Sequence, residues 1–138
     1  GLPDNGSLIA LDKNSETNLK AQSFFKKANQ DKKIKTIVNP ALETLEKLKH
    51  DNLIFDIIFI DADKNNYINY YDKVIEMTKS GGLIIIDNVL WHGEVADAQN
   101  NEKFTNIIRD FNNYVKNDKR TEQIILPLGD GLTICSKL

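Results

Sequence analysis

Hydrophobic runs and amphipathic segments alternate along this chain, which predicts alternating strands and helices. A short apolar run at residues 7–11 and three runs rich in β-branched residues and Phe, at residues 34–38, 53–60 and 83–86, are typical of strands. The last run is almost purely β-branched, as expected of a strand that is covered on both faces of a parallel sheet. We therefore expect residues 83–86 to lie at the centre of the sheet.

Apolar residues recur with helical spacing in three segments between these runs, and each segment has one apolar face. The three sets are Leu19, Phe24, Phe25 and Ala28; Leu42, Leu45 and Leu48; and Tyr67, Tyr71, Val74 and Ile75. Asn39 followed by Pro40 predicts the start of the second helix, because it places a cap residue before a proline at the first helical position. Ser80, Gly81 and Gly82 predict the end of the third helix.

The C-terminal part of the chain predicts a further helix and a pair of strands. Helical spacing continues through Phe104, Ile107, Ile108, Phe111, Tyr114 and Val115. Residues 123–128 and 132–135 flank Gly129-Asp130-Gly131, a tight-turn signature, so we expect the last strand to be antiparallel. The pattern lapses over residues 88–101, which marks a candidate functional loop. The whole predicts a single α/β domain over residues 1–138, with a mostly parallel sheet and helices on both faces.

Composition narrows the classes of partner. The 138 residues are 41% hydrophobic and 28% charged, which is typical of a soluble globular protein. Eighteen basic and twenty acidic residues give a net charge of -2 without a long block of one sign, so we expect no nucleic-acid partner. The apolar runs are far shorter than the ~20 residues that span a bilayer. With no leader pattern and a single cysteine, a cytoplasmic protein without a membrane partner is expected.

Three predicted strands end in an aspartate, namely Asp12, Asp61 and Asp87. In an open parallel sheet, ligands bind beyond the carboxyl ends of the strands. Asp61, Asp87 and Asn88 supply hard oxygen atoms there and can share a divalent cation such as Mg²⁺, with positions left for the two oxygens of a vicinal diol. Asp12 stands where α/β nucleotide-binding folds place an acid against ribose hydroxyls, in NAD enzymes and methyltransferases alike.

Other candidate ligands favour structural roles. His50 and His92 have no partner at metal-ligand spacing and the chain has no cysteine cluster, which disfavours zinc. We interpret His50 as a cation at a helix end and His92 as a loop contact. Cys135 lies in an apolar run and is interpreted as a small buried hydrophobe without a catalytic role.

Two longer motifs carry a resemblance to a known family. They are FIDADKNNY at residues 59–67 and GGLIIIDNVLWHG at residues 81–93. Together with ALD at 10–12, PALETL at 40–45 and PLGDGLT at 127–133, they resemble the metal-dependent class I O-methyltransferases related to the caffeoyl-CoA and catechol enzymes. The resemblance covers essentially the whole chain and implies a Rossmann-like methyltransferase sandwich.

The resemblance also implies a role for each matched residue. It makes Asp61, Asp87 and Asn88 the metal ligands. It places Asp12, Pro40 and Ala41 beside S-adenosylmethionine, with Asp61 close to the amino-acid end of that cofactor. Lys64 becomes the general base and works with Asp61 in catalysis. Trp91 and Tyr67 line the acceptor pocket, although a packing role is an equally good interpretation of these aromatic side chains.

The implied reaction is methyl transfer to a metal-chelated phenol. The cation acidifies the phenol, Lys64 takes its proton, and the phenolate attacks the sulfonium methyl group without a covalent enzyme intermediate. Mg²⁺ is the first choice of metal, with Mn²⁺ and Ca²⁺ as alternatives. The implied partners are a small phenolic or catechol acceptor and a second copy of the protein in a homodimer.

Family members place a glycine-rich cofactor turn after the first strand of the fold, upstream of residues like 2–6 of this chain. We therefore expect that strand, which normally lies between the strands ending at Asp12 and Asp61, to be missing here together with N-terminal helices. Asn39 also replaces a glycine that is frequent in relatives. We interpret the chain as a piece of a longer protein. A strand supplied by another chain and a degraded relative are the alternatives.

Other functions remain open beside methyl transfer. The first is a non-catalytic remnant that acts as a structural or interaction protein. Asp61-Ala62-Asp63 suggests an aspartate-based phosphotransferase, but Asn65 stands where a threonine or valine is expected. A dinucleotide oxidoreductase is disfavoured because the sequence has no G-x-G-x-x-G motif. Detection of methyl transfer would separate the methyltransferase hypothesis from these three alternatives.

Overall fold

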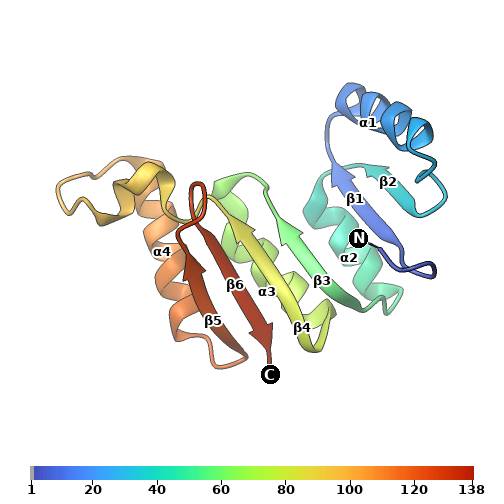
Figure 1. Cartoon of the computed structure of the whole chain (residues 1–138). Coiled ribbons are helices and arrows are strands. Elements are labelled where there is room, and N and C mark those ends of the chain that lie inside the picture. The colour runs from blue at the N-terminus through green and yellow to red at the C-terminus, as the bar shows by residue number, and fades with distance from the viewer. Residues whose placement is uncertain (1) are drawn as a thin grey trace. The chain divides into compact units, whose positions relative to one another are not determined.

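The computed structural model describes residues 2–138, which fall into two compact units that meet in the sequence at Asp51 and Asn52. The strands form two sheets, β1–β2 in the first unit and β3–β4–β6–β5 in the second, where the sequence predicts one sheet (Figure 1). Among residues 2–138, every helix is too short or too polar to span a bilayer.

The first unit alternates two strands with two helices: β1 (Leu8–Asp12), α1 (Ser15–Lys27), β2 (Ile34–Val38) and α2 (Ala41–His50). The strands are parallel and in register from Leu8 opposite Ile34 to Asp12 opposite Val38. Asn14 caps α1, because its side-chain oxygen accepts hydrogen bonds from the next two amides at 2.9 and 3.0 Å. The two strands therefore end at the same edge.

The start of α2 differs in detail from the prediction. Pro40 is the cap residue and Ala41 the first helical residue, and no side chain caps this end. The Asn39 amide group donates to Glu43 Oε2 at 3.3 Å and Thr44 Oγ1 at 3.4 Å. The prediction that Asn39 caps the helix is wrong, because its side chain is used as a donor toward the first turn.

The second unit contains four strands, two α-helices and two short 3₁₀ turns. In chain order they are β3 (Phe55–Ile60), η1 (Lys64–Asn66), α3 (Tyr67–Met77), β4 (Thr78–Asp87), η2 (Trp91–Ala96), α4 (Lys103–Asn117), β5 (Thr121–Leu126) and β6 (Leu132–Lys137). β3 and β4 are parallel, whereas β6 is antiparallel to both β4 and β5. The predicted antiparallel strand at the C-terminus is therefore confirmed.

β4 begins earlier than its apolar run predicts. α3 ends at Met77, so Gly81 and Gly82 lie inside β4 and do not end the helix, contrary to the prediction. Gly81 has a φ of 75°, and the β3–β4 register shifts between Phe55 and Ile57. A Cβ atom on Gly82 would lie 2.9 Å from the Asp56 carbonyl oxygen. These glycines allow an irregular, close approach of the two strands.

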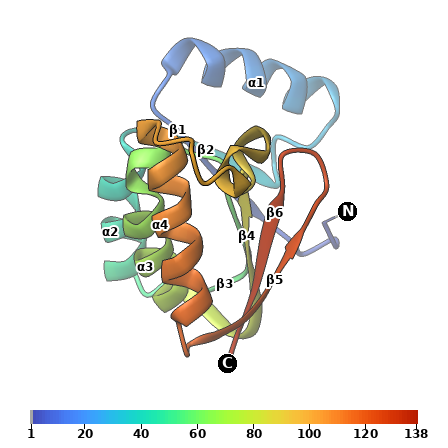
Figure 2. The same cartoon turned by 90° about the vertical axis from the view of Figure 1, so that its left-hand side faces the viewer.

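α3 and α4 cover the same face of the four-stranded sheet (Figure 2). The core between them contains fully buried side chains from both helices and from the strands: Tyr71, Val74, Ile75, Ile108, Phe111, Ile84, Ile86 and Cys135. Burial of Cys135 is as predicted, and it raises the pKa of the thiol to about 11. On the opposite face Ile57 and Phe59 are 60% and 58% exposed. The sequence analysis expected helices on both faces of the sheet, but the helices of this unit cover only one.

Candidate active site

The parallel pairing of β3 and β4 brings Asp61 and Asp87 to one edge of the sheet. Ile60 lies opposite Ile86, and an aspartate follows each of them in the chain. Asp87 is the last residue of β4, and Asn88 follows with a φ of 59°. Asparagine tolerates this left-handed backbone better than most residues do. The three oxygen-bearing side chains therefore lie at the carboxyl ends of two neighbouring strands, as predicted.

Lys64 joins these strand ends from the η1 turn. Its ammonium donates to Asn88 Oδ1 at 2.7 Å and lies 3.5 Å from Asp61 Oδ1. It also donates to the Tyr67 hydroxyl. The Lys64 side chain is only 13% exposed, whereas that of Asp61 is 56% exposed. One largely buried cation thus contacts two of the three candidate metal ligands.

Tyr67 is the buried residue of this cluster and contacts Lys64 from below the surface. It is 1% exposed, and its ring packs edge-on against Phe111 with centroids 5.2 Å apart. Its hydroxyl donates to the Asp87 carbonyl oxygen at 2.9 Å. Burial raises the pKa of the Tyr67 phenol well above its usual value, and the charges of Asp61 and Asp87 raise it further. The hydroxyl therefore stays protonated at neutral pH and serves as a donor.

Three more hydrogen bonds hold the cluster in place. The Asn88 backbone N–H donates to Asp87 Oδ1 at 2.7 Å, which orients the Asp87 carboxylate. Asp63 accepts hydrogen bonds from the Tyr70 hydroxyl at 2.7 Å and from the Asn66 side chain at 2.8 Å. Asp63 thereby ties η1 to α3. These hydrogen bonds of Asp63, which directly precedes Lys64, hold the η1 turn in place.

The donor set fits a hard divalent cation. Among residues 2–138, no three His, Cys, Asp or Glu side chains lie together as a metal-binding group, so the set depends on the Asn88 amide as its third ligand. Oxygen atoms of Asp61 and Asn88 already converge on one cation, the Lys64 ammonium. Carboxylate and amide oxygens are the ligands that Mg²⁺ and Ca²⁺ prefer.

The loop after Asn88 is anchored on the turn between β5 and β6. The amides of Val89 and Leu90 donate to the carbonyl oxygens of Gly131 at 3.2 Å and Asp130 at 2.9 Å. The His92 backbone N–H donates to the Asp130 carboxylate, and its imidazole Nδ1 lies 3.8 Å from Asp130 Oδ1, in agreement with the loop contact that the sequence analysis expects. The half-buried Trp91 ring lies 5.9 Å from the Phe104 ring.

The candidate cofactor residues Asp12, Pro40 and Ala41 lie in the first unit. The Asn39 backbone N–H donates to the Asp12 carbonyl oxygen at 3.1 Å, so the ends of β1 and β2 meet at one edge. The Asp12 carboxylate accepts a hydrogen bond from the Asn14 amide at 2.9 Å. Within this unit the three residues are thus gathered at the carboxyl ends of two parallel strands.

The sequence analysis missed residues that hold the loop after Asn88. The Asn112 side chain donates to the Val89 carbonyl oxygen at 2.8 Å, and Arg109 donates to several carbonyl oxygens of the loop. These acceptors belong to the backbone, which every residue has. No sequence motif therefore points to these contacts.

Comparison with known proteins relates the whole chain to one family. A family model described as O-methyltransferase matches residues 1–138. The caffeoyl-CoA O-methyltransferase of Petroselinum crispum is 39% identical over 146 residues, which cover 99% of this chain and 61% of that protein. The probable caffeoyl-CoA O-methyltransferase 2 of Dictyostelium discoideum is 39% identical over 138 residues, covering 98% and 60%. The chain thus spans about three fifths of the length of these relatives.

Solved structures agree with the sequence relatives. The O-methyltransferase from Bacillus cereus, in complex with SAH, superposes with a TM-score of 0.88 at 28% identity, over 99% of this chain and 66% of that one. A putative O-methyltransferase from Klebsiella pneumoniae gives 0.88 at 30% identity, over 99% and 64%. The predicted Rossmann-like methyltransferase fold is therefore confirmed.

Proposed function

Since this chain belongs to the O-methyltransferase family, we propose that its protein transfers a methyl group from S-adenosylmethionine to a hydroxyl of a catechol-like acceptor held by a divalent metal. The observation that carries the proposal is the Lys64 ammonium, which contacts both Asn88 Oδ1 and Asp61 Oδ1 where β3 and β4 end. A cationic group, a set of hard oxygen ligands and a buried phenol meet at one edge of the sheet. Such a cluster suits proton removal from a chelated hydroxyl.

Asp61, Asp87 and Asn88 would hold the metal, with Mg²⁺ as the first choice and Mn²⁺ or Ca²⁺ as alternatives. When bound, a divalent cation supplies Lewis-acid stabilisation of the acceptor's phenolate oxygen. Two carboxylates and one amide leave positions for two acceptor oxygens, which favours a vicinal diol. The donor set therefore supports an acceptor that carries two neighbouring oxygens.

Lys64 moves the proton in this scheme. Lys64 has to lose its own proton before the reaction, so that its amine can accept the proton of the acceptor hydroxyl; Asn88 Oδ1 and Asp61 then contact the resulting ammonium, the form in which Lys64 is held in the structure. The phenolate oxygen then bonds to the methyl carbon while the bond from that carbon to sulfur breaks, and S-adenosylhomocysteine leaves. Alignment of two bound reactants can contribute roughly 7 to 11 kcal/mol to such a step.

The other site residues orient the reactants. Tyr67 holds Lys64 through its hydroxyl, and the Trp91 ring offers an apolar side to the acceptor. Asp12 would bind the ribose of S-adenosylmethionine, with Pro40 and Ala41 at the adenine. The homodimer stays a prediction.

The first experiment is a calorimetric titration of S-adenosylmethionine, with Mg²⁺ present, into the 138-residue chain and into the longest product of the gene that contains it. A methyl-transfer assay with catechol follows, before and after removal of metal with EDTA. The expected result is transfer that EDTA stops and Mg²⁺ restores. Binding of the cofactor without transfer to any catechol would overturn the proposed reaction and favour a non-catalytic relative.

Matched variants test the metal ligands directly. Asp87→Asn should weaken Mn²⁺ binding at least about tenfold and abolish transfer, because it removes a charged ligand. Asp110→Asn is the control, since Asp110 is an exposed aspartate on α4. Equal Mn²⁺ affinity in the two variants would exclude Asp87 as a ligand.

A further inference from the structure

From Trp91 to Asn100, the loop after Asn88 contains no fully buried side chain. Within η2, the residues Trp91, His92 and Gly93 have φ values of 47°, 56° and 82°, in the left-handed region. Residues 96–99 are all exposed. Such a segment needs polar contacts to keep one conformation, because it buries few side chains.

Arg109 of α4 supplies those contacts. Its Nε donates to Val95 O at 3.0 Å, and Nη1 donates to Asn100 O at 2.6 Å. Nη2 donates to Glu94 O at 3.1 Å and also to Asp97 O. A further bond from Nη1 reaches Asn106 Oδ1 at 3.0 Å within the helix. Every N–H donor of the guanidinium is thus used, and four of the five acceptors are backbone carbonyls of residues 94–100.

One helical turn earlier, Thr105 adds a second tie on the same face of α4. It is fully buried, and its hydroxyl donates to Glu94 Oε2 at 2.9 Å. Phe104 beside it meets the Trp91 ring at 5.9 Å. The first two turns of α4 therefore hold both the start and the middle of the loop.

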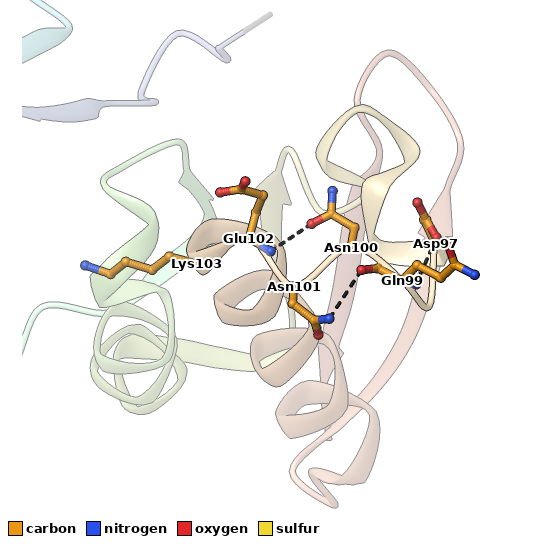
Figure 3. A pocket seen from close by; sticks show the side chains of 6 residues that line it. All are labelled: Asp97, Gln99, Asn100, Asn101, Glu102 and Lys103. Carbon is orange, nitrogen blue, oxygen red and sulfur yellow. Dashed lines mark hydrogen bonds between the residues drawn. The ribbon is translucent and has the colours of Figure 1, made fainter.

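The far part of the loop keeps its shape by local bonds. Figure 3 shows the polar hollow that Asp97 and residues 99–103 line, in which Asn100 Oδ1 accepts from the Glu102 backbone N–H at 2.8 Å. The Gln99 amide likewise donates to Asp97 Oδ1 at 2.9 Å. These short-range turns shape the segment but do not attach it to the rest of the unit. Two side chains of α4 attach it there: Asn106 donates to the Asn101 carbonyl oxygen at 3.2 Å, and the Arg109 guanidinium makes the contacts with residues 94–100.

We propose that Arg109 is a positioning residue: its guanidinium holds residues 94–100 on α4 and thereby fixes Trp91 for acceptor binding. The acceptor part of this inference rests on the proposed function. Lysine cannot replace Arg109, because an ammonium has three donors and lacks the planar fork that reaches four carbonyls at once.

The test compares Arg109→Lys with Arg120→Lys. The sequence has two arginines, and Arg120 bonds the carboxylates of Asp72 and Asp118, which lie outside the loop. Trp91 is the only tryptophan, so its fluorescence reports on the loop alone. In Arg109→Lys we expect amide hydrogen exchange at residues 94–101 to rise roughly 10- to 100-fold and Trp91 quenching by acrylamide to increase. Arg120→Lys should leave both values unchanged.

Kinetics test the second half of the inference in the active protein. Arg109→Lys should raise the KM for a catechol acceptor about tenfold while the Kd for S-adenosylmethionine stays unchanged. Unchanged exchange and quenching would overturn the clamp, and a loosened loop with an unchanged acceptor KM would overturn the role in positioning. If the unmodified protein transfers no methyl group, the proposed function fails, and the exchange and fluorescence results still decide whether Arg109 holds the loop.

Discussion

The Lys64 ammonium and the Asn88 side-chain oxygen are 24 positions apart in the chain and 2.7 Å apart in space. The contact depends on the parallel ladder of β3 and β4, which ends both strands at one edge. The η1 turn then directs Lys64 back over the end of β4. The backbone thus places a cationic side chain among the candidate metal ligands, and this arrangement can be tested one residue at a time.

Replacement of Lys64 by methionine should remove catalysis and keep the fold. Methionine has an unbranched side chain like that of lysine but no amine that can accept a proton, so methyl transfer should fall roughly 10²- to 10⁴-fold. The cost in stability should be about 1 kcal/mol, because Asn88 Oδ1 loses a donor. Kinetics and urea unfolding measure the two effects. The exposed Lys116 of α4 gives the control variant Lys116→Met, and equal activity of the two variants would contradict a role for Lys64 in proton transfer.

Tyr67→Phe should separate support of Lys64 from contact with the acceptor. The ring and its packing against Phe111 remain, whereas the hydrogen bond to the Asp87 carbonyl oxygen is lost. We expect a lower kcat, a smaller loss than in Lys64→Met, and a stability cost of about 1 kcal/mol.

The control is Tyr71→Phe, which removes a buried hydroxyl that bonds Thr121 Oγ1 at 3.0 Å. It should be destabilised to a similar degree with kcat unchanged. A raised acceptor KM with normal kcat in Tyr67→Phe would instead show that Tyr67 lines the acceptor pocket, the role that the family resemblance implies.

The strand-end cluster could be predicted because its placement depends on local patterns and one general rule. Apolar runs mark β3 and β4, and parallel strands with acids after them bring those acids to a common edge. The contacts of Asp63 and Tyr67 could not be predicted in the same way. An aspartate or tyrosine has several partners within reach, and only the turn geometry of η1 decides among them.

The larger errors concern how elements meet. Helical spacing shows that α3 and α4 each have one apolar face, but it does not tell which face of the sheet they cover. Gly81 and Gly82 are equally suited to a helix terminus and to a close approach of strands, and contact with Asp56 decides for the second. The Arg109 contacts leave no trace in the loop sequence, since their acceptors are mostly backbone carbonyls.

Alkaline pH should destabilise the second unit through its buried tyrosines. Burial, with the hydrogen bond to Asp63, raises the pKa of Tyr70 to about 12, and the pKa values of Tyr67 and Tyr71 are also raised, chiefly by burial. The native state then holds these protons more tightly than the unfolded chain, where tyrosine titrates near a pKa of about 10. Their contribution to stability is therefore intact below about pH 10 and is lost as the pH rises toward about 12.

Urea unfolding at a series of alkaline pH values, followed with tyrosinate absorbance, measures this loss. Tyr70→Phe should lose less stability over the same pH range, because it removes one titrating phenol. At neutral pH it should be about 1 kcal/mol less stable, since Asp63 loses a hydrogen bond. A pH dependence equal to that of the unmodified protein would show that Tyr70 does not contribute to alkaline unfolding.

Gly131 and Gly129 offer a matched test of how the turn between β5 and β6 supports the loop after Asn88. Both have left-handed φ values, 84° and 59°, so alanine at either position is strained by about 1 to 2 kcal/mol. A Cβ atom on Gly131 would also lie 2.4 Å from Leu90 Cγ, whereas nothing lies within 4 Å of one on Gly129. Gly131→Ala should therefore destabilise the protein by roughly 1 to 3 kcal/mol more than Gly129→Ala does, the usual cost of overpacking.

Because Leu90 precedes Trp91, the clash should also change the fluorescence of Trp91 in Gly131→Ala and leave it unchanged in Gly129→Ala. Urea unfolding and emission spectra of the two variants check both effects. Equal unfolding free energies and equal spectra would mean that Leu90 moves aside without resistance. The turn would then not hold the start of the loop, and the conformation of Trp91 would depend on α4 alone.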